Sequence, residues 1–294
     1  MEINKEQLSA LLLDLQLDPS IQTALLRGFD IWQDRLVMMA DQAFIGQPET
    51  LPVCRRKPFT RLLLTCCCLL PLKAHFVSHG IPRGIYLDTI SDLTLRIQLY
   101  QEAVGKLGLS CRDVRWFYRL VHFSIFKLGA LQFELAEMTY PEEMKNAKPC
   151  SILRPELRSS LPSGTPVLRI HIQKGASLER QSVAESLQFA QRFFIQYFPE
   201  HDFRAFVCDS WLLYPGLRSL LSENSRIAQF ADRFLLAGSV QDPAESIRRI
   251  YGKRYRRRAD YPSATALQAA AIGHFSQLGE GCGVILLGES SENA

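Results

Sequence analysis

Residues 167–211 read VLRIHIQKGASLERQSVAESLQFAQRFFIQYFPEHDFRAFVCDSW, and their hydrophobic pattern changes twice along the way. Residues 167–173 alternate polar and apolar side chains, a period of two that predicts a half-buried strand. Residues 183–197 place apolar side chains three or four apart, which predicts an amphipathic helix. Residues 203–209 are mostly apolar and predict a second strand. A strand, a helix and a strand in succession indicate an α/β layer.

The rest of the second half adds to this layer. Apolar runs predict further strands at "ALQFELAEM" (130–138), "RFLLAGSV" (233–240) and "GVILLG" (283–288), which makes roughly five strands in total. A polar loop with proline and glycine separates the first of these from residue 167. Between the last two, Asp242-Pro243 opens a short helix, and a longer helix is predicted with Ser263 as its cap and Gly279 as its stop.

The first half has only the helical period. Asn4 and Asp18-Pro19 are suited to begin two helices, and a third is predicted from about Pro58 to His75 with an interruption at Pro71. Asp88 is expected to cap the next one. The predicted fold class is therefore α+β, with a helical N-terminal domain at 1–125 and an α/β domain at 126–294.

Composition narrows the function classes. The 294 residues are 47% hydrophobic and 22% charged, as in a soluble globular protein, and a net charge of +4 does not by itself indicate a nucleic-acid partner. None of the eight cysteines forms a C-x-x-C pair, so we expect reduced thiols and no metal site. The N-terminus is no secretory signal, and the apolar stretch Leu62–Leu72 is too short for a membrane span. A cytoplasmic protein without a membrane partner is expected, and the oligomeric state stays open.

Several stretches in order along the chain resemble a bacterial acyltransferase-like family, in which a helical N-acyltransferase N-terminal domain precedes a GNAT-like C-terminal domain. They are "HGIPRGIYLDTISDL" (79–93), "LGALQFEL" (128–135), "LRIHIQKGASL" (168–178), "CDSWLLYPGL" (208–217), "SRIAQFADRF" (225–234) and "YPSATALQAAA" (261–271). The resemblance implies the acyl-CoA N-acyltransferase fold, acetyl-CoA or another acyl-CoA as cosubstrate, and a small-molecule acceptor, with no metal.

In the GNAT fold, the catalytic groups gather where two adjacent parallel strands splay apart. By resemblance, those strands are 167–173 and 203–209. Alternation places His171 on the same face as Arg169 and Gln173, and Asp209 and Tyr214 follow at the end of the second strand. His171, Asp209 and Tyr214 are therefore the catalytic candidates, as base or acid. Each also has a structural alternative: a hydrogen-bonded histidine, a turn cap and a rigid anchor.

The phosphate-binding loop expected from the resemblance is incomplete. GNAT enzymes usually carry Q/R-x-x-G-x-G/A, whose amides hold the pyrophosphate at a helix N-terminus. Here the turn is "QKGASLERQ", with Gln173, Gly175, Ala176 and Ser177 as the cofactor-binding candidates. Because the full spacing is missing, a catalytically inactive GNAT-like binding or regulatory protein is the alternative to an enzyme.

Two other features stay open. Glu134 alternates opposite the apolar face of its strand, where it is either a base or, as we favour, a solvated residue. The run "GKRYRRR" (252–258) is the densest basic patch. It is expected to be a solvated helix end rather than a nucleic-acid site, and contact with the 3′-phosphate of coenzyme A is a third reading.

Overall fold

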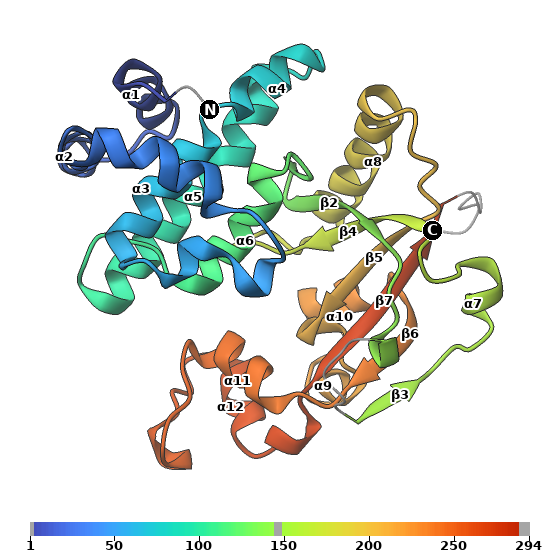
Figure 1. Cartoon of the computed structure of the whole chain (residues 1–294). Coiled ribbons are helices and arrows are strands. Elements are labelled where there is room, and N and C mark those ends of the chain that lie inside the picture. The colour runs from blue at the N-terminus through green and yellow to red at the C-terminus, as the bar shows by residue number, and fades with distance from the viewer. Residues whose placement is uncertain (1–2, 144–148, 288–294) are drawn as a thin grey trace. The chain divides into compact units, whose positions relative to one another are not determined.

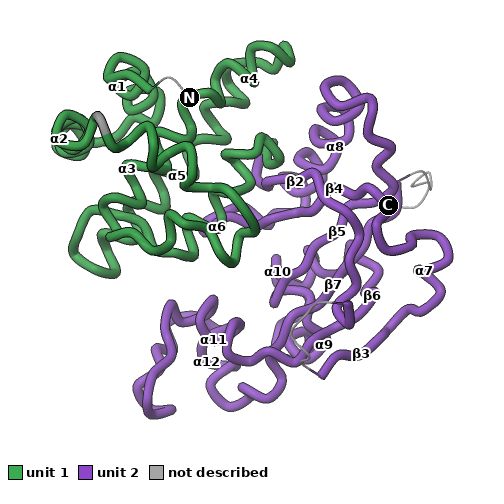
Figure 2. The backbone as a smooth tube through the Cα atoms, in the orientation of Figure 1, with its two compact units in different colours: residues 1–128 green, residues 129–294 purple. Residues whose placement is uncertain are grey.

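A computed structural model describes residues 3–143 and 149–287 and divides the chain into two compact units. Unit 1 covers residues 1–128 and unit 2 covers residues 129–294 (Figure 2). Unit 1 is helical and unit 2 is built on a mixed sheet, so the predicted fold class is confirmed. The units divide at 128/129, whereas the sequence pattern predicts a boundary at 125/126.

Unit 1 consists of helices that end in a short strand. The helices are α1 (Lys5–Asp14), α2 (Pro19–Ala43), α3 (Pro58–Leu69), α4 (Leu72–Ser78), α5 (Arg83–Val104) and α6 (Cys111–Val121), and the strand is β1 (Ile125–Leu128). Asn4 caps α1 by accepting a 2.8 Å hydrogen bond from the Gln7 amide, and Asp18 caps α2, as their side-chain chemistry predicts.

Prolines set the limits of the middle helices. Pro71 separates α3 from α4, as predicted. The prediction that Asp88 caps a helix is wrong, because α5 already begins at Arg83, directly after Pro82. Proline has a fixed φ and no N–H, so it starts a helix without needing a side-chain cap, and Asp88 lies inside the helix.

The segment Pro58–Ser78 is long and apolar enough to cross a bilayer by length and composition alone. In the structure 61% of its apolar window is buried within the protein, and Leu62, Leu63 and Cys66 are fully buried. Such burial is what the core helix of a globular unit requires. The stretch is therefore accounted for by the core of unit 1.

Unit 2 carries one sheet with the strand order β2-β4-β5-β7-β6-β3 among its described residues (Figure 1). The strands are β2 (Leu131–Glu137), β3 (Cys150–Ile152), β4 (Pro166–His171), β5 (Ala205–Ser210), β6 (Leu235–Val240) and β7 (Glu280–Leu286). Of the strand pairs in the part of unit 2 that the structure describes, β4–β5 alone is parallel. The short strands β1 and β3 were not predicted, since three or four residues carry too little periodicity.

The helices of unit 2 connect these strands, and α8 makes the long crossover between β4 and β5. They are α7 (Leu157–Ser160), α8 (Arg180–Tyr197), α9 (Pro215–Arg218), α10 (Arg226–Ala231), α11 (Pro243–Tyr251) and α12 (Ala266–Ile272). The predicted cap of α12 is wrong: Thr265, not Ser263, accepts from the Gln268 amide in a capping box. The helix also ends before Gly279, and a 3-10 turn, η6 (Phe275–Gln277), follows.

A 3-10 turn, η4 (Trp211–Leu213), follows β5 and lies directly on the backbone of β7. Glycines make this approach possible. A Cβ on Gly281 would lie 2.6 Å from the Leu213 carbonyl carbon, and one on Gly283 would lie 2.7 Å from the Leu213 Cδ1. Only residues without a side chain fit there, so the glycines of β7 determine where the chain goes after β5.

This packing predicts the effect of adding one methyl group. Gly281→Ala should lower the free energy of unfolding by about 1–3 kcal/mol, because the new Cβ meets backbone that cannot move aside. Gly273→Ala is the matched control, since open space surrounds Gly273 at a φ of −78°. Urea unfolding measures both, and equal stability of the two variants would contradict the prediction.

Candidate functional site

The parallel strands β4 and β5 pair over only part of their length. Their register runs from Leu168↔Phe206 to Arg169↔Val207. Beyond this point β4 continues to His171, still paired with β2, and β5 continues to Ser210, still paired with β7. The two strands therefore diverge at their carboxyl ends, as the arrows in Figure 1 show.

Polar side chains share one face of the sheet at this diverging end. The register pairs Gln132 with His171 and Glu134 with Arg169. Since partners in a ladder point to the same face and alternate residues repeat it, Asp209 lies on that face as well. The sequence placed His171 and Arg169 together, but it did not reveal Gln132 and Glu134 as their neighbours.

His171 and Glu134 form a hydrogen-bonded pair. The distance from His171 Nε2 to Glu134 Oε2 is 2.6 Å, and the side chains are 19% and 13% exposed. The interpretation of Glu134 as a solvated residue is therefore wrong. The antiparallel register of β2 and β4 brings it diagonally across from His171, and strand alternation alone cannot supply that register.

Arg169 and Asp209 join β4 to β5. The distance from Arg169 Nε to Asp209 Oδ2 is 3.4 Å, and Arg169 also donates to the Glu137 carbonyl at 3.2 Å. Burial raises the pKa of the Cys208 and Cys282 thiols, and the neighbouring Asp209 carboxylate adds to the rise. Both cysteines are therefore protonated and do not act as nucleophiles.

Tyr214 is held by packing. A Cβ on Gly216 would lie 2.9 Å from the ring, and one on Gly279 would lie 2.5 Å from it. The ring belongs, with that of Trp211, to the partly buried residues around the apolar cluster of Leu217 and its neighbours. The Ser210 hydroxyl accepts from the Leu212 amide and caps η4.

The predicted phosphate loop lies between β4 and α8. Gly175 has a φ of +84°, and the Ala176 amide donates to the Gln173 carbonyl at 3.0 Å. One of the amides predicted to bind the pyrophosphate is therefore hydrogen-bonded within the turn. The Ser177 hydroxyl accepts from the Glu179 amide at 3.3 Å. Helix α8 then begins at Arg180 without a side-chain cap.

Cations surround the start of α8. Arg226 lies 3.0 Å from the Glu179 carboxylate, and Arg233 donates to the Arg180 carbonyl at 2.8 Å. Burial, together with the nearby Arg180 charge, lowers the pKa of Arg233. Uncapped amides and several guanidinium groups are chemically suited to hold a phosphate. Arg226 and Arg233 could not be predicted as neighbours of this helix end, because they come from α10 and the turn after it.

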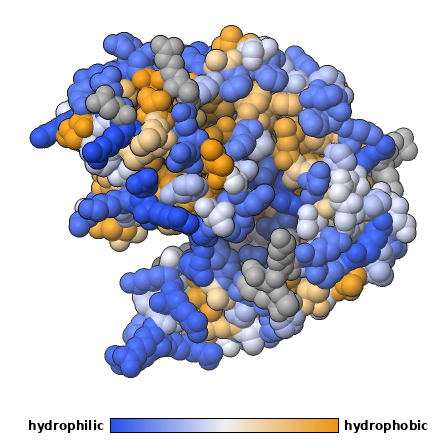
Figure 3. All heavy atoms as spheres, in the orientation of Figure 1, coloured by the Kyte–Doolittle hydropathy of each residue, from blue (hydrophilic) through white to orange (hydrophobic). Residues whose placement is uncertain are grey.

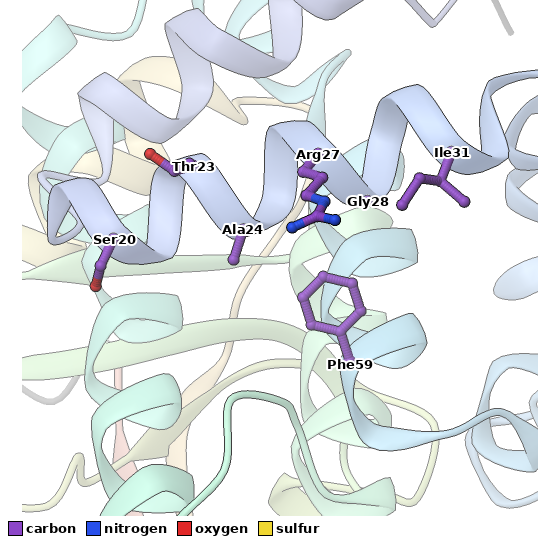
Figure 4. Close-up of a pocket in the computed structure, with 7 residues that line it drawn as sticks. All are labelled: Ser20, Thr23, Ala24, Arg27, Gly28, Ile31 and Phe59. Atoms are coloured by element: carbon purple, nitrogen blue, oxygen red, sulfur yellow. The ribbon is translucent and has the colours of Figure 1, made fainter.

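A shallow pocket of about 390 Å³ lies in unit 1, between α2 and the start of α3 (Figure 4). Its hydroxyls are engaged locally: Ser20 donates to Asp18 at 2.6 Å, and Thr23 donates to the Pro19 carbonyl at 2.8 Å. The remaining lining side chains are Ala24, Arg27, Gly28, Ile31 and Phe59. None of the described residues that line this pocket carries a carboxylate, an imidazole or a thiol. Among the residues that the structure describes, no cluster of His, Cys, Asp and Glu could hold a metal ion.

Comparison with known families gives two matches. Residues 5–123 match the N-acyltransferase N-terminal domain, and residues 125–285 match the GNAT-like C-terminal domain. Together the two matches cover nearly the whole chain in the predicted order. A comparison with curated proteins found no significant match.

Solved structures share this fold over most of the chain. An acyltransferase in complex with decanoyl-CoA has a TM-score of 0.71 at 21% identity, covering 95% of this chain and 86% of that chain. An acyltransferase in complex with decanoyl-CoA and teicoplanin has a TM-score of 0.69 at 21% identity, covering 95% and 87%. An acyltransferase in complex with CoA and 10C-teicoplanin has a TM-score of 0.65 at 23% identity, covering 92% and 80%.

The His171–Glu134 contact predicts a measurable coupling. We consider a double-mutant cycle of His171→Asn and Glu134→Gln. The double variant should lose about 1 kcal/mol less free energy of unfolding than the sum of the two single losses, because the half-buried pair shares one hydrogen bond. The control pair is His201 and Glu200, 3.4 Å apart with side chains 45% and 63% exposed, whose coupling should be close to zero. Additive losses at His171 and Glu134 would disprove the contact.

Proposed function

Because the chain belongs to the family that joins an N-acyltransferase N-terminal domain to a GNAT-like C-terminal domain, we propose that it transfers an acyl group from an acyl-CoA to an acceptor amine. The observation that carries this proposal is the His171–Glu134 pair at the diverging end of β4 and β5. The solved acyltransferases of the same fold hold decanoyl-CoA or CoA, which supports an acyl-CoA as the donor here.

The donor would lie along the diverging strands, with its pyrophosphate at the start of α8. Three features support this arrangement. The first turn of α8 has amides without a side-chain cap, and Arg226 and Arg233 supply positive charge beside it. The turn at Gln173, Gly175, Ala176 and Ser177 leads into that helix, and Gly175 supplies the left-handed residue that the tight turn needs.

His171 would act as the general base. In the tautomer that donates from Nε2 to Glu134, Nδ1 carries the lone pair that accepts a proton from the attacking amine. The Glu134 carboxylate then stabilises the imidazolium that forms, and it fixes the ring orientation. Removing such a base costs about 10²–10⁴-fold in rate.

Tyr214 and Asp209 would have different roles. The Tyr214 phenol, on a ring held between two glycines, is the candidate acid that returns a proton to the leaving thiolate. Asp209 is engaged with Arg169, so we assign it to holding the two strands together rather than to proton transfer. This changes the interpretation of Asp209 from a catalytic to a positioning residue.

Gln132 would supply a contact to the substrate. Its side chain is 2% exposed and stands opposite His171, and its Oε1 accepts no hydrogen bond from any described residue. A buried carbonyl oxygen without a donor costs about 1–3 kcal/mol. An amide or amine N–H of a bound substrate would relieve that cost.

The state of the cysteines supports a proposal about the cellular location. All eight cysteines are free, and burial raises the pKa of Cys67 to about 12. Free thiols in this number are characteristic of a reducing compartment. We therefore propose that the protein acts in the cytoplasm.

The alternative is a GNAT-like protein that binds acyl-CoA without turnover. The internal hydrogen bond of the Ala176 amide and the acidic Glu179 at the start of α8 favour it, since both weaken a phosphate site. Binding and turnover have to be measured separately to distinguish the two.

We expect purified protein to bind decanoyl-CoA in isothermal titration calorimetry, and to release CoA when a panel of primary amines is added. His171→Ala and Glu134→Gln should each lower CoA release by about 10²-fold or more while the Kd for decanoyl-CoA changes less than about threefold, because the pair acts on the proton and not on the donor. The control is His201→Ala, which changes an exposed histidine far from His171 in the sequence. It should leave both the CoA release and the Kd for decanoyl-CoA unchanged.

Two outcomes decide against parts of the proposal. A folded protein that binds neither acetyl-CoA nor decanoyl-CoA would overturn the donor assignment. Binding without CoA release from any amine, in wild type and variants alike, would favour the alternative without turnover.

A further inference from the structure

Residues 241–279, between β6 and β7, form a lobe that we call the C-terminal lobe, and its apolar core also includes Leu217 of α9. It contains α11, α12 and the turns η5 (Arg258–Asp260) and η6. Its core holds Ile247, Tyr251, Tyr261, Ala271 and Leu278. The lobe therefore has a stable base on which a binding site can be built.

Aromatic rings line a pocket of about 530 Å³ on this lobe. The ring of Tyr261 lies 5.0 Å from that of Tyr255 and 5.0 Å from that of Phe275. The Tyr261 hydroxyl donates to the Tyr255 carbonyl at 3.3 Å, which fixes the loop against the core. The pocket volume is in the range of sites for small molecules.

Arginines surround the same pocket. Arg254, Arg256 and Arg258 line it, and no carboxylate in residues 3–143 or 149–287 pairs with any of the three. Arg258 lies over the Phe275 ring, 5.5 Å from its centroid. Figure 3 shows strongly hydrophilic atoms at the lower left, where Figure 1 draws the segment after α11.

The other arginines of the lobe are paired with carboxylates. Arg248 and Arg249 lie 3.1 Å and 2.9 Å from the Glu245 carboxylate, and Arg257 lies 3.9 Å from Asp260. The lobe thus holds two kinds of arginine, those paired with acids and those gathered around aromatic rings. A general solvated basic face does not predict this separation.

The lobe is attached to the end of the sheet that carries His171 and Asp209. The register Ser210↔Gly281 places the start of β7 beside the end of β5, and the lobe ends where β7 begins. Trp211 and Tyr214, which follow β5, pack on the core of the lobe. The lobe that carries the pocket is therefore joined to the end of the sheet where the candidate site lies.

We propose that this basic-aromatic pocket binds a phosphate ester that carries a planar ring. Guanidinium groups bind phosphate oxygens in a bidentate manner, and a partly buried aromatic wall favours stacking with a second ring. Unpaired arginines alone would bind any anion, whereas the three rings beside them select an aryl or nucleoside phosphate.

Titration of the full chain with phenyl phosphate, in the absence of any CoA, tests this assignment. Phenyl phosphate should bind at least tenfold more tightly than inorganic phosphate, and benzyl alcohol should not bind measurably. Equal affinity for phenyl phosphate and inorganic phosphate would overturn the proposal, because the rings would then contribute nothing.

Paired variants separate the pocket from net charge. Arg254→Gln/Arg256→Gln should weaken phenyl phosphate binding at least tenfold, whereas Arg248→Gln/Arg249→Gln, with the same loss of charge in the same lobe, should change it less than twofold. Tyr255→Leu should reduce the affinity for phenyl phosphate to that for inorganic phosphate. Far-UV circular dichroism confirms that each variant is folded, and equal losses in both double variants would overturn the proposal.

The phosphate ester could belong to the nucleotide end of the donor or to the acceptor. The choice between these two sources rests on the proposed function. If Arg254→Gln/Arg256→Gln weakens binding of CoA but not of dephospho-CoA, which lacks the 3′-phosphate, the ligand is the donor nucleotide. If binding of CoA is unchanged while that of phenyl phosphate is lost, the ligand is the acceptor. Failure of the wild type to bind CoA would refute the proposed donor and leave the phenyl phosphate result standing.

Discussion

The parallel ladder between β4 and β5 ends at Arg169↔Val207, and the rest of the candidate site depends on this limit. Each strand continues because its outer neighbour holds it: β2 pairs with β4 up to His171, and β7 pairs with β5 up to Ser210. Both strands therefore stay hydrogen-bonded where they diverge. The divergence separates the side chains at the end of β4 from those at the end of β5, which a full ladder would hold side by side. The polar groups of both strands lie at this one end of the sheet.

The glycines of β7 place the next segment. Backbone can lie on backbone at Gly281 only because no Cβ intervenes, and the same holds where Gly279 meets the Tyr214 ring. Glycine weakens the strand in which it lies, so the glycines of β7 reduce the local stability of that strand. What the protein gains is a fixed path after β5, along which Trp211 and Tyr214 connect the sheet end to the C-terminal lobe.

Charge is organised differently in the two parts of unit 2. At the diverging strands, ionisable side chains are paired with one another, His171 with Glu134 and Arg169 with Asp209. Such pairing fixes the orientation of these side chains and holds the two strands together. Around the pocket of the C-terminal lobe the arginines lie beside rings instead of carboxylates. Because no described carboxylate pairs with Arg254, Arg256 or Arg258, these arginines are suited to bind an acidic group of a ligand.

The sequence by itself determined the fold class, the strand–helix–strand unit of residues 167–211, and the face on which His171 lies, because periods of 3.6 and 2 and the family's stretches are local properties of the chain. It missed Glu134 as the partner of His171, the ion pair of Arg169 with Asp209, and the cations from α10. Each of these depends on the register between strands or on the packing of distant helices, and residues far apart in the sequence carry no local signal for either. Tertiary structure alone decided which polar groups meet.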